Sequence, residues 1–170
     1  AAEQAGYYGN YLSIMSIPFI IVGPIVHFIF PVISELYGRW DKEKIQIIHK
    51  EFSLYFSILA IWIGVFLFQF WEHLSVLLFT EKFRISWEIL KYSSFFLIFN
   101  FLIQINFQVL SGTGKIRDRA RILLIILPIN IILNIILIKW FSTLPGYLAV
   151  YGSALAVWIT WIPLWYMTHI

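Results

Sequence analysis

Residues 122–138 read ILLIILPINIILNIILI and contain no charged side chain. With its continuation to Trp140, this apolar run is close to the about 20 residues that a helix needs to cross a bilayer, at about 1.5 Å per residue. The apolar residues are contiguous and do not alternate with polar ones, as they would in the strands of a membrane barrel. The run therefore predicts a membrane-spanning helix over residues 122–140.

The rest of the chain repeats this pattern. Of the 170 residues, 61% are hydrophobic and 12% are charged, whereas soluble domains carry about 25% charged residues. We therefore expect an all-α, polytopic bundle of transmembrane helices in a cell membrane. The five expected spans cover about residues 11–33, 52–71, 87–110, 122–140 and 147–167.

Basic residues predict the orientation of these spans. Four lie in the first connection and four in the third, and fewer lie in the other two. Because lysine and arginine concentrate on the cytoplasmic side, both connections are predicted inside and the N-terminal end outside. An outside start without an initiating methionine suggests that residues 1–170 form one helical lobe of a longer chain. The basic residues are Arg39, Lys42, Lys44 and Lys50, then Lys115, Arg117, Arg119 and Arg121.

Residues 39–51 also carry an apolar helical face beside their lysines. This pattern is typical of a short helix that lies on the inner membrane surface. The formal net charge of +3 is concentrated in such connections, so it indicates topology, and no nucleic-acid partner is expected.

Several kinds of chemistry are not expected. The chain has no cysteine, which excludes disulfides and thiolate metal sites. Residues 111–115 read SGTGK, but Val109 and Ile116 stand where a phosphate-binding loop needs a glycine and a serine or threonine. These glycines are expected to serve a turn. No triad or pair of carboxylates lies within the spans, so neither an enzyme, a metal site nor a cofactor is predicted.

The first span contains helix-breaking residues. Pro18, Pro24 and Pro31 each lack a backbone donor, and Gly23 precedes the second of them. This span is therefore expected to be bent or broken. A hinge facing a cavity and an ordinary kinked helix are both consistent with the pattern. His27 in the same span is either part of a proton relay or a hydrogen-bonded structural residue.

The third span carries a polar stripe. Asn100, Gln104 and Gln108 share one helical face with Ser93 and Ser111. Amides that face lipid without partners are costly, so the stripe is expected to face protein or water. We favour the wall of a hydrophilic passage over hydrogen bonds to neighbouring helices.

Polar residues outside the stripe are weaker candidates. Lys91 and Asn106 lie on the opposite side of the third span, where Lys91 can extend to the interface. Asn130 and Asn134 share a face of the fourth span and are expected to bond a partner helix or, less readily, a ligand.

Five sequence motifs resemble one family. They are QAGYY at 4–8, FPVISEL at 30–36, LSGTGK at 110–115, NIILNIILI at 130–138 and PGYLAVYGSA at 145–154. In this order they resemble the polysaccharide transporter family, within the multidrug/oligosaccharidyl-lipid/polysaccharide exporter superfamily. The resemblance implies that the chain corresponds to helices eight to twelve of about twelve, in the second of two lobes.

The resemblance also implies a function. Such a flippase moves polyprenyl-diphosphate-linked oligosaccharide across the inner membrane of a bacterium or archaeon by alternating access, with membrane lipid and the missing N-terminal lobe as partners. A cation-coupled multidrug exporter and a membrane polymerase or ligase are the alternatives. The spans carry few of the cations expected around the substrate. The expected cavity residues are Asn100, Gln104, Gln108, His27, Lys91, Asn130 and Asn134, and the expected hinge residues are Pro18, Gly23, Pro24 and Pro31.

Overall fold

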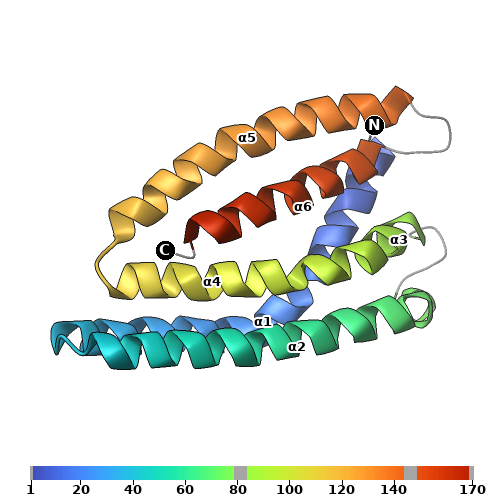
Figure 1. Ribbon diagram of the computed structural model, residues 1–170. Helices are drawn as coiled ribbons and strands as arrows, with labels where there is room; N and C mark the ends of the chain where they lie inside the picture. The colour runs from blue at the N-terminus through green and yellow to red at the C-terminus, as the bar shows by residue number, and fades with distance from the viewer. Residues whose placement is uncertain (1, 79–83, 144–148, 169–170) are drawn as a thin grey trace.

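The computed structural model describes residues 2–78, 84–143 and 149–168. They form helices joined by short turns and contain no strand (Figure 1). This confirms the all-α prediction. The elements are α1 (Ala2–Gly38), α2 (Lys42–Leu78), α3 (Arg84–Ser93), the 3₁₀ helix η2 (Ser94–Phe96), α4 (Leu97–Gly112), α5 (Ile116–Thr143) and α6 (Ala149–Thr168).

Five stretches of these helices are long and apolar enough to cross a membrane. Each contains most of one predicted span and extends beyond at least one of its ends. The protein is thus a multi-pass membrane protein. The stretches are Gly6–Gly38, Lys42–Phe70, Glu88–Gly112, Ile116–Thr143 and Val150–Thr168.

The predicted surface helix over residues 39–51 is wrong. Only a short turn follows α1, and α2 then continues without interruption from Lys42 into the second span. The physical reason is local, since no proline or glycine stands between Lys42 and Gly64 to end a helix. Lys42, Lys44 and Lys50 therefore stand on the first turns of the spanning helix itself, and Arg39 lies in the turn before it.

The third span is not one regular α-helix. The 3₁₀ turn η2 separates α3 from α4, and the side chains of Ser93 and Ser94 bond back to carbonyl oxygens of the preceding turn. A Cβ on Gly64 of α2 would lie 2.8 Å from the carbonyl oxygen of Ser94. Glycine at this position therefore allows α2 to approach the irregular turn closely.

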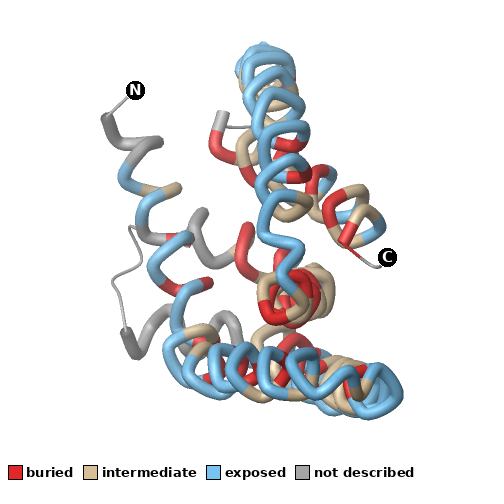
Figure 2. Tube along the Cα trace, turned by 90° about the vertical axis from the view of Figure 1, so that its left-hand side faces the viewer, coloured by how far each residue is buried: buried red, intermediate tan, exposed pale blue. Residues whose placement is uncertain are grey.

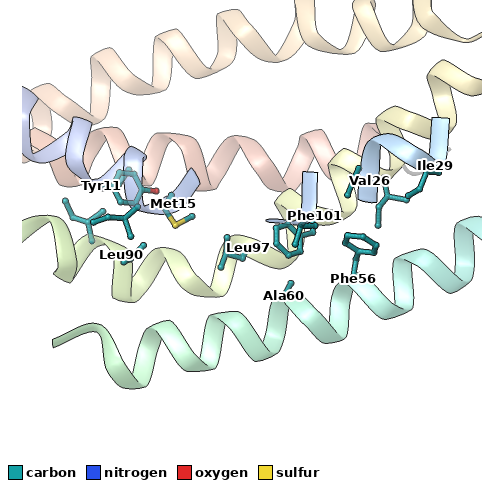
Figure 3. Packing of buried hydrophobic residues seen from close by; sticks show 14 of the residues in the cluster. Tyr11, Met15, Val26, Ile29, Phe56, Ala60, Leu90, Leu97 and Phe101 are labelled. Carbon is teal, nitrogen blue, oxygen red and sulfur yellow. The ribbon is translucent and has the colours of Figure 1, made fainter. Parts of the chain in front are cut away.

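The α4 helix occupies the centre of the bundle. Figure 1 shows it between α1 and α2 on one side and α5 and α6 on the other. It packs against α1, α2 and α6, whereas α5 packs chiefly against α6. Phe101 of α4 lies beside Phe56 of α2 (Figure 3), with ring centroids 6.3 Å apart, and beside Phe19 of α1, with centroids 5.0 Å apart. In Figure 2, buried residues gather where helices meet and exposed ones cover their outward sides.

Two turns of the same design lie at one end of the bundle, together with the end of α6 (Figure 1, left). After α1, the Asp41 N–H donates to the Leu36 carbonyl at 3.1 Å, and Trp40 has a φ of 58°. After α4, the Lys115 N–H donates to the Leu110 carbonyl at 2.8 Å, and Gly114 has a φ of 73°. Both are Schellman helix ends.

These turns, with the starts of α2 and α5 that follow them, hold the basic residues that predicted orientation, and we call this end of the bundle the basic end. Its placement on the cytoplasmic side stays a prediction. The expectation that the glycines of residues 111–115 serve a turn is consistent with the positive φ of Gly114, a conformation that glycine adopts most readily.

Candidate functional site

The predicted polar stripe of the third span makes one contact with α1. The amide Nε2 of Gln108 lies 3.0 Å from Nδ1 of His27, and Gln108 is buried. Because the amide nitrogen donates, His27 accepts through Nδ1 and carries its proton on Nε2 in this arrangement. Two of the predicted cavity residues are therefore brought together, and they join the central helix to the proline-rich one.

Gln104 lies beside this pair. It lines, with His27, a cavity of about 160 Å³ between α1 and α4. Gly23 lines the same cavity, and Figure 1 shows that α1 is bent along its course. α1 nevertheless continues as a helix through all three of its prolines. Of the two predicted outcomes for this span, a bent helix and a broken one, the structure has the bent helix.

Gly23 supplies backbone freedom to α1. A Cβ added there would meet nothing within 4 Å, so packing does not require the glycine. Pro18 is buried, while Pro24 and Pro31 are exposed. A hinge role for these four residues stays a prediction.

The remaining predicted site residues lie elsewhere. Asn100 is half-buried one helical turn before Gln104. Lys91 places its Nζ 5.0 Å from the ring centroid of Phe68 of α2, a cation–π contact near the opposite end from the basic turns. These two residues do not line the cavity around His27.

The two asparagines of α5 form side-chain hydrogen bonds. Asn130 donates from Nδ2 to the Thr160 hydroxyl of α6 at 3.1 Å, and Asn134 donates to the Asn130 side-chain oxygen at 3.0 Å. Asn130 therefore bonds a partner helix, as the sequence analysis favoured, whereas the Asn134 amide donates within α5. The predicted site residues therefore lie in separate places: between α1 and α4, where α3 meets α2, and between α5 and α6.

Asn106 has the most extensive interhelical bonding of the α4 amides, although it lies outside the predicted stripe. It is 3% exposed. Its Oδ1 lies 2.7 Å from Nε2 of His49 on α2, and its Nδ2 donates to the Thr168 hydroxyl of α6 at 3.1 Å. One asparagine therefore connects three helices.

A larger cavity of about 560 Å³ opens beside Asn106 at the basic end. We call it the basic-end cavity. Sequence reasoning missed it because its walls come from four helices, and because residues 39–51 were expected on the membrane surface. The two basic connections in the sequence were the signal that could have indicated this cavity. Its polar and aromatic lining includes Tyr37, Trp40, Lys42, His49, Asn106, Lys115 and Thr168.

The chemistry available at these sites is hydrogen bonding and charge attraction. Amide and imidazole groups near the α1 bend offer donors and acceptors that suit hydroxyl-rich ligands. Lysines at the basic end offer positive charge.

No family model, curated protein or solved structure matches the chain. The resemblance to the polysaccharide transporter family therefore rests on the sequence motifs.

Proposed function

We propose that this chain is part of a transporter that moves polyprenyl-diphosphate-linked oligosaccharide across a membrane by alternating access. The observation that carries the proposal is the polar contact between α4 and the bent helix α1. Gln108 is buried on α4 and bonds to His27, which is exposed on α1, and Gln104 lines a small cavity together with His27. The ordered motifs that resemble the polysaccharide transporter family support the same function.

A bend beside a cavity that contains two polar side chains suits alternating access. Proline removes one backbone hydrogen bond of its helix, so the helix bends there at lower cost than elsewhere. A change of the bend angle would move His27 relative to Gln104 and open or close the space between them. Sugar hydroxyls could form hydrogen bonds with these amide and imidazole groups. The amides and the imidazole would then keep hydrogen-bond partners when their present contacts separate.

The test is transport by the protein in proteoliposomes that contain a fluorescent polyprenyl-diphosphate-linked oligosaccharide. Replacing Gln104→Leu keeps the size of the side chain and removes its hydrogen bonds. One lost hydrogen bond corresponds to about 1 kcal/mol, so we expect the initial rate to fall about fivefold. Gln69→Leu is the matched control, because Gln69 is exposed on α2 and lies outside this cavity.

Accessibility gives a second measurement. The chain has no cysteine, so a single cysteine placed at Gln104 can be labelled without background. We expect it to react with a small polar thiol reagent, and more slowly when substrate is bound. An inert cysteine together with normal transport by Gln104→Leu would show that α4 uses its amides for packing alone. Absence of transport by the unaltered protein would overturn the function itself.

A further inference from the structure

The basic-end cavity collects positive charge from two different turns. Lys42 is the first residue of α2, and Lys115 directly precedes α5. Both line the cavity. They lie more than seventy positions apart in the sequence, and the parallel placement of the two Schellman turns brings them to one opening. Each also stands at the positive end of a helix dipole, which adds to the local potential.

Most of the acidic residues nearby are already paired with other cations. Glu35 pairs with Arg39 at 2.6 Å, Asp41 with Lys44 at 2.8 Å, and Asp118 with Arg121 at 3.1 Å. Among the described residues, Lys42 and Lys115 form no ion pair. The two remaining acids of this end, Glu43 and Glu51, are exposed and do not line the cavity.

The Asp41 carboxylate is held in place by its own turn. Its Oδ1 accepts the backbone N–H of Lys44 at 3.1 Å, and hydrogen bonds from Lys44 lower the pKa of Asp41. Because Asp41 is committed to Lys44 as a helix cap, it is a poor partner for its neighbour Lys42. The positive charge at the cavity is therefore left for a ligand.

Three polar side chains in the wall of the cavity, Asn106, His49 and Thr168, are connected by hydrogen bonds. Thr168 donates to the Trp165 carbonyl at 2.9 Å and accepts from the Asn106 amide. The Asn106 side-chain oxygen is thereby directed at His49, which donates through Nε2. Trp40 is 77% exposed at the mouth, where amphipathic aromatic side chains meet lipid headgroups.

We propose that the basic-end cavity binds a phosphate group, held by Lys42 and Lys115, and that an anionic membrane lipid supplies this phosphate through its headgroup. The cavity volume of about 560 Å³ lies in the usual range for small-molecule sites, about 300–1,000 Å³. Its position at the ends of five spans is the depth at which headgroups lie. The site does not depend on the proposed transport function, because binding can be measured without transport.

Basic residues at the ends of spans are common, so the cavity must be separated from general surface attraction. The double variant Lys42→Gln/Lys115→Gln removes two cavity charges. Lys50→Gln/Arg117→Gln is the matched control, since it removes two exposed charges at the same end that do not line the cavity. Lys42→Arg/Lys115→Arg keeps the charge and serves as the rescue variant.

The experiment measures dissociation constants by calorimetry for the protein in non-ionic detergent. The probes are short-chain phosphatidylglycerol, phosphatidylcholine of the same chain length, inorganic phosphate and pyrophosphate. Charge-assisted hydrogen bonds predict a loss of about tenfold for each lysine removed. We therefore expect phosphatidylglycerol to bind more tightly than phosphatidylcholine. The cavity variant, which removes two lysines, should weaken phosphatidylglycerol binding about a hundredfold, and the control less than twofold. The arginine variant should restore binding.

The probes also identify the source of the phosphate. Binding of phosphate or pyrophosphate with the same lysine dependence, without binding of phosphatidylglycerol, would overturn the lipid as ligand. If the cavity and control variants weakened phosphatidylglycerol binding equally, general attraction to the basic surface would explain the binding, and the proposed site would be wrong. Absence of binding by every probe would overturn it too. Circular dichroism of each variant shows whether its helices are intact, and the folded arginine variant keeps the test valid if the glutamine variant unfolds.

Discussion

The span formed by α3, η2 and α4 and the span formed by α5 differ in how the rest of the chain covers them. In the most apolar part of the first, 50% of the residues are buried, against 17% in α5. The α5 sequence is nevertheless the more hydrophobic, with a mean hydropathy of 2.6 against 1.5. In a membrane the less hydrophobic helix takes the centre, because its polar groups need protein partners while apolar side chains are equally stable against lipid.

The two spans also contact their neighbours in different ways. α4 uses amides that bond to three other helices, as Asn106 and Gln108 show. α5 meets α6 along a close backbone approach at Gly152 and one interhelical amide bond at Asn130. Variants at matched positions of the two regions test this difference.

The largest effect is expected at the glycine contacts. A Cβ on Gly152 would lie 2.6 Å from the backbone of Leu137, whereas a Cβ on Gly112 meets the Ile33 side chain at 2.7 Å and the Phe30 carbonyl oxygen at 3.1 Å. Side chains can move more readily than a helix backbone. Gly152→Ala should therefore cost about 3 kcal/mol of unfolding free energy and Gly112→Ala about 1–2 kcal/mol.

Reversible unfolding in mixed micelles, followed by circular dichroism, measures both values. Gly38→Ala is the control, because a Cβ there meets nothing within 4 Å, and it should leave stability nearly unchanged. A larger cost at Gly112 than at Gly152 would contradict the proposed difference between the two regions.

An intermediate effect is expected at the asparagines. Asn106→Leu removes two interhelical hydrogen bonds, to His49 and to Thr168, which should cost about 2 kcal/mol. Asn130→Leu removes one interhelical bond to Thr160, and such bonds between membrane helices average about 0.6 kcal/mol. The same unfolding assay compares the two. Equal costs would mean that α4 gains nothing from its central position.

The smallest effect is expected at the two turns. Gly114 and Trp40 occupy the same position of a Schellman helix end, with φ of 73° and 58°. A side chain in this conformation costs about 1 kcal/mol, so Gly114→Ala should destabilise by that amount. Trp40→Gly should relieve the same strain and leave stability unchanged or higher. A loss on Trp40→Gly as large as that on Gly114→Ala would show that tryptophan contacts outweigh the backbone strain.

Local sequence signals predicted the parts of this protein that depend on one helix at a time. The five spans follow from uninterrupted apolar length, and the turn at Gly114 follows from glycine beside lysine. The bend of α1 was foreseen from its prolines. The surface helix over 39–51 was a false prediction, because an amphipathic face on the first turns of α2 resembles one that lies in the interface.

The partners of the polar groups could not be predicted in the same way. The stripe of Asn100, Gln104 and Gln108 follows from helical spacing, but the bond of Gln108 to His27 depends on how α1 is rotated about its axis. Asn106 was set aside because it lies off that stripe, and only the position of α2 brings His49 to it.

The sequence by itself determined that this chain is a bundle of membrane-crossing helices with its basic turns at one end. Backbone hydrogen bonds must be satisfied within each helix in lipid, so hydrophobic length alone decides where helices form. Tertiary structure decided which helix is central, which amides meet which histidines, and that Lys42 and Lys115 line one cavity. These relations depend on helix rotation and close glycine contacts, and they join residues that no local pattern connects.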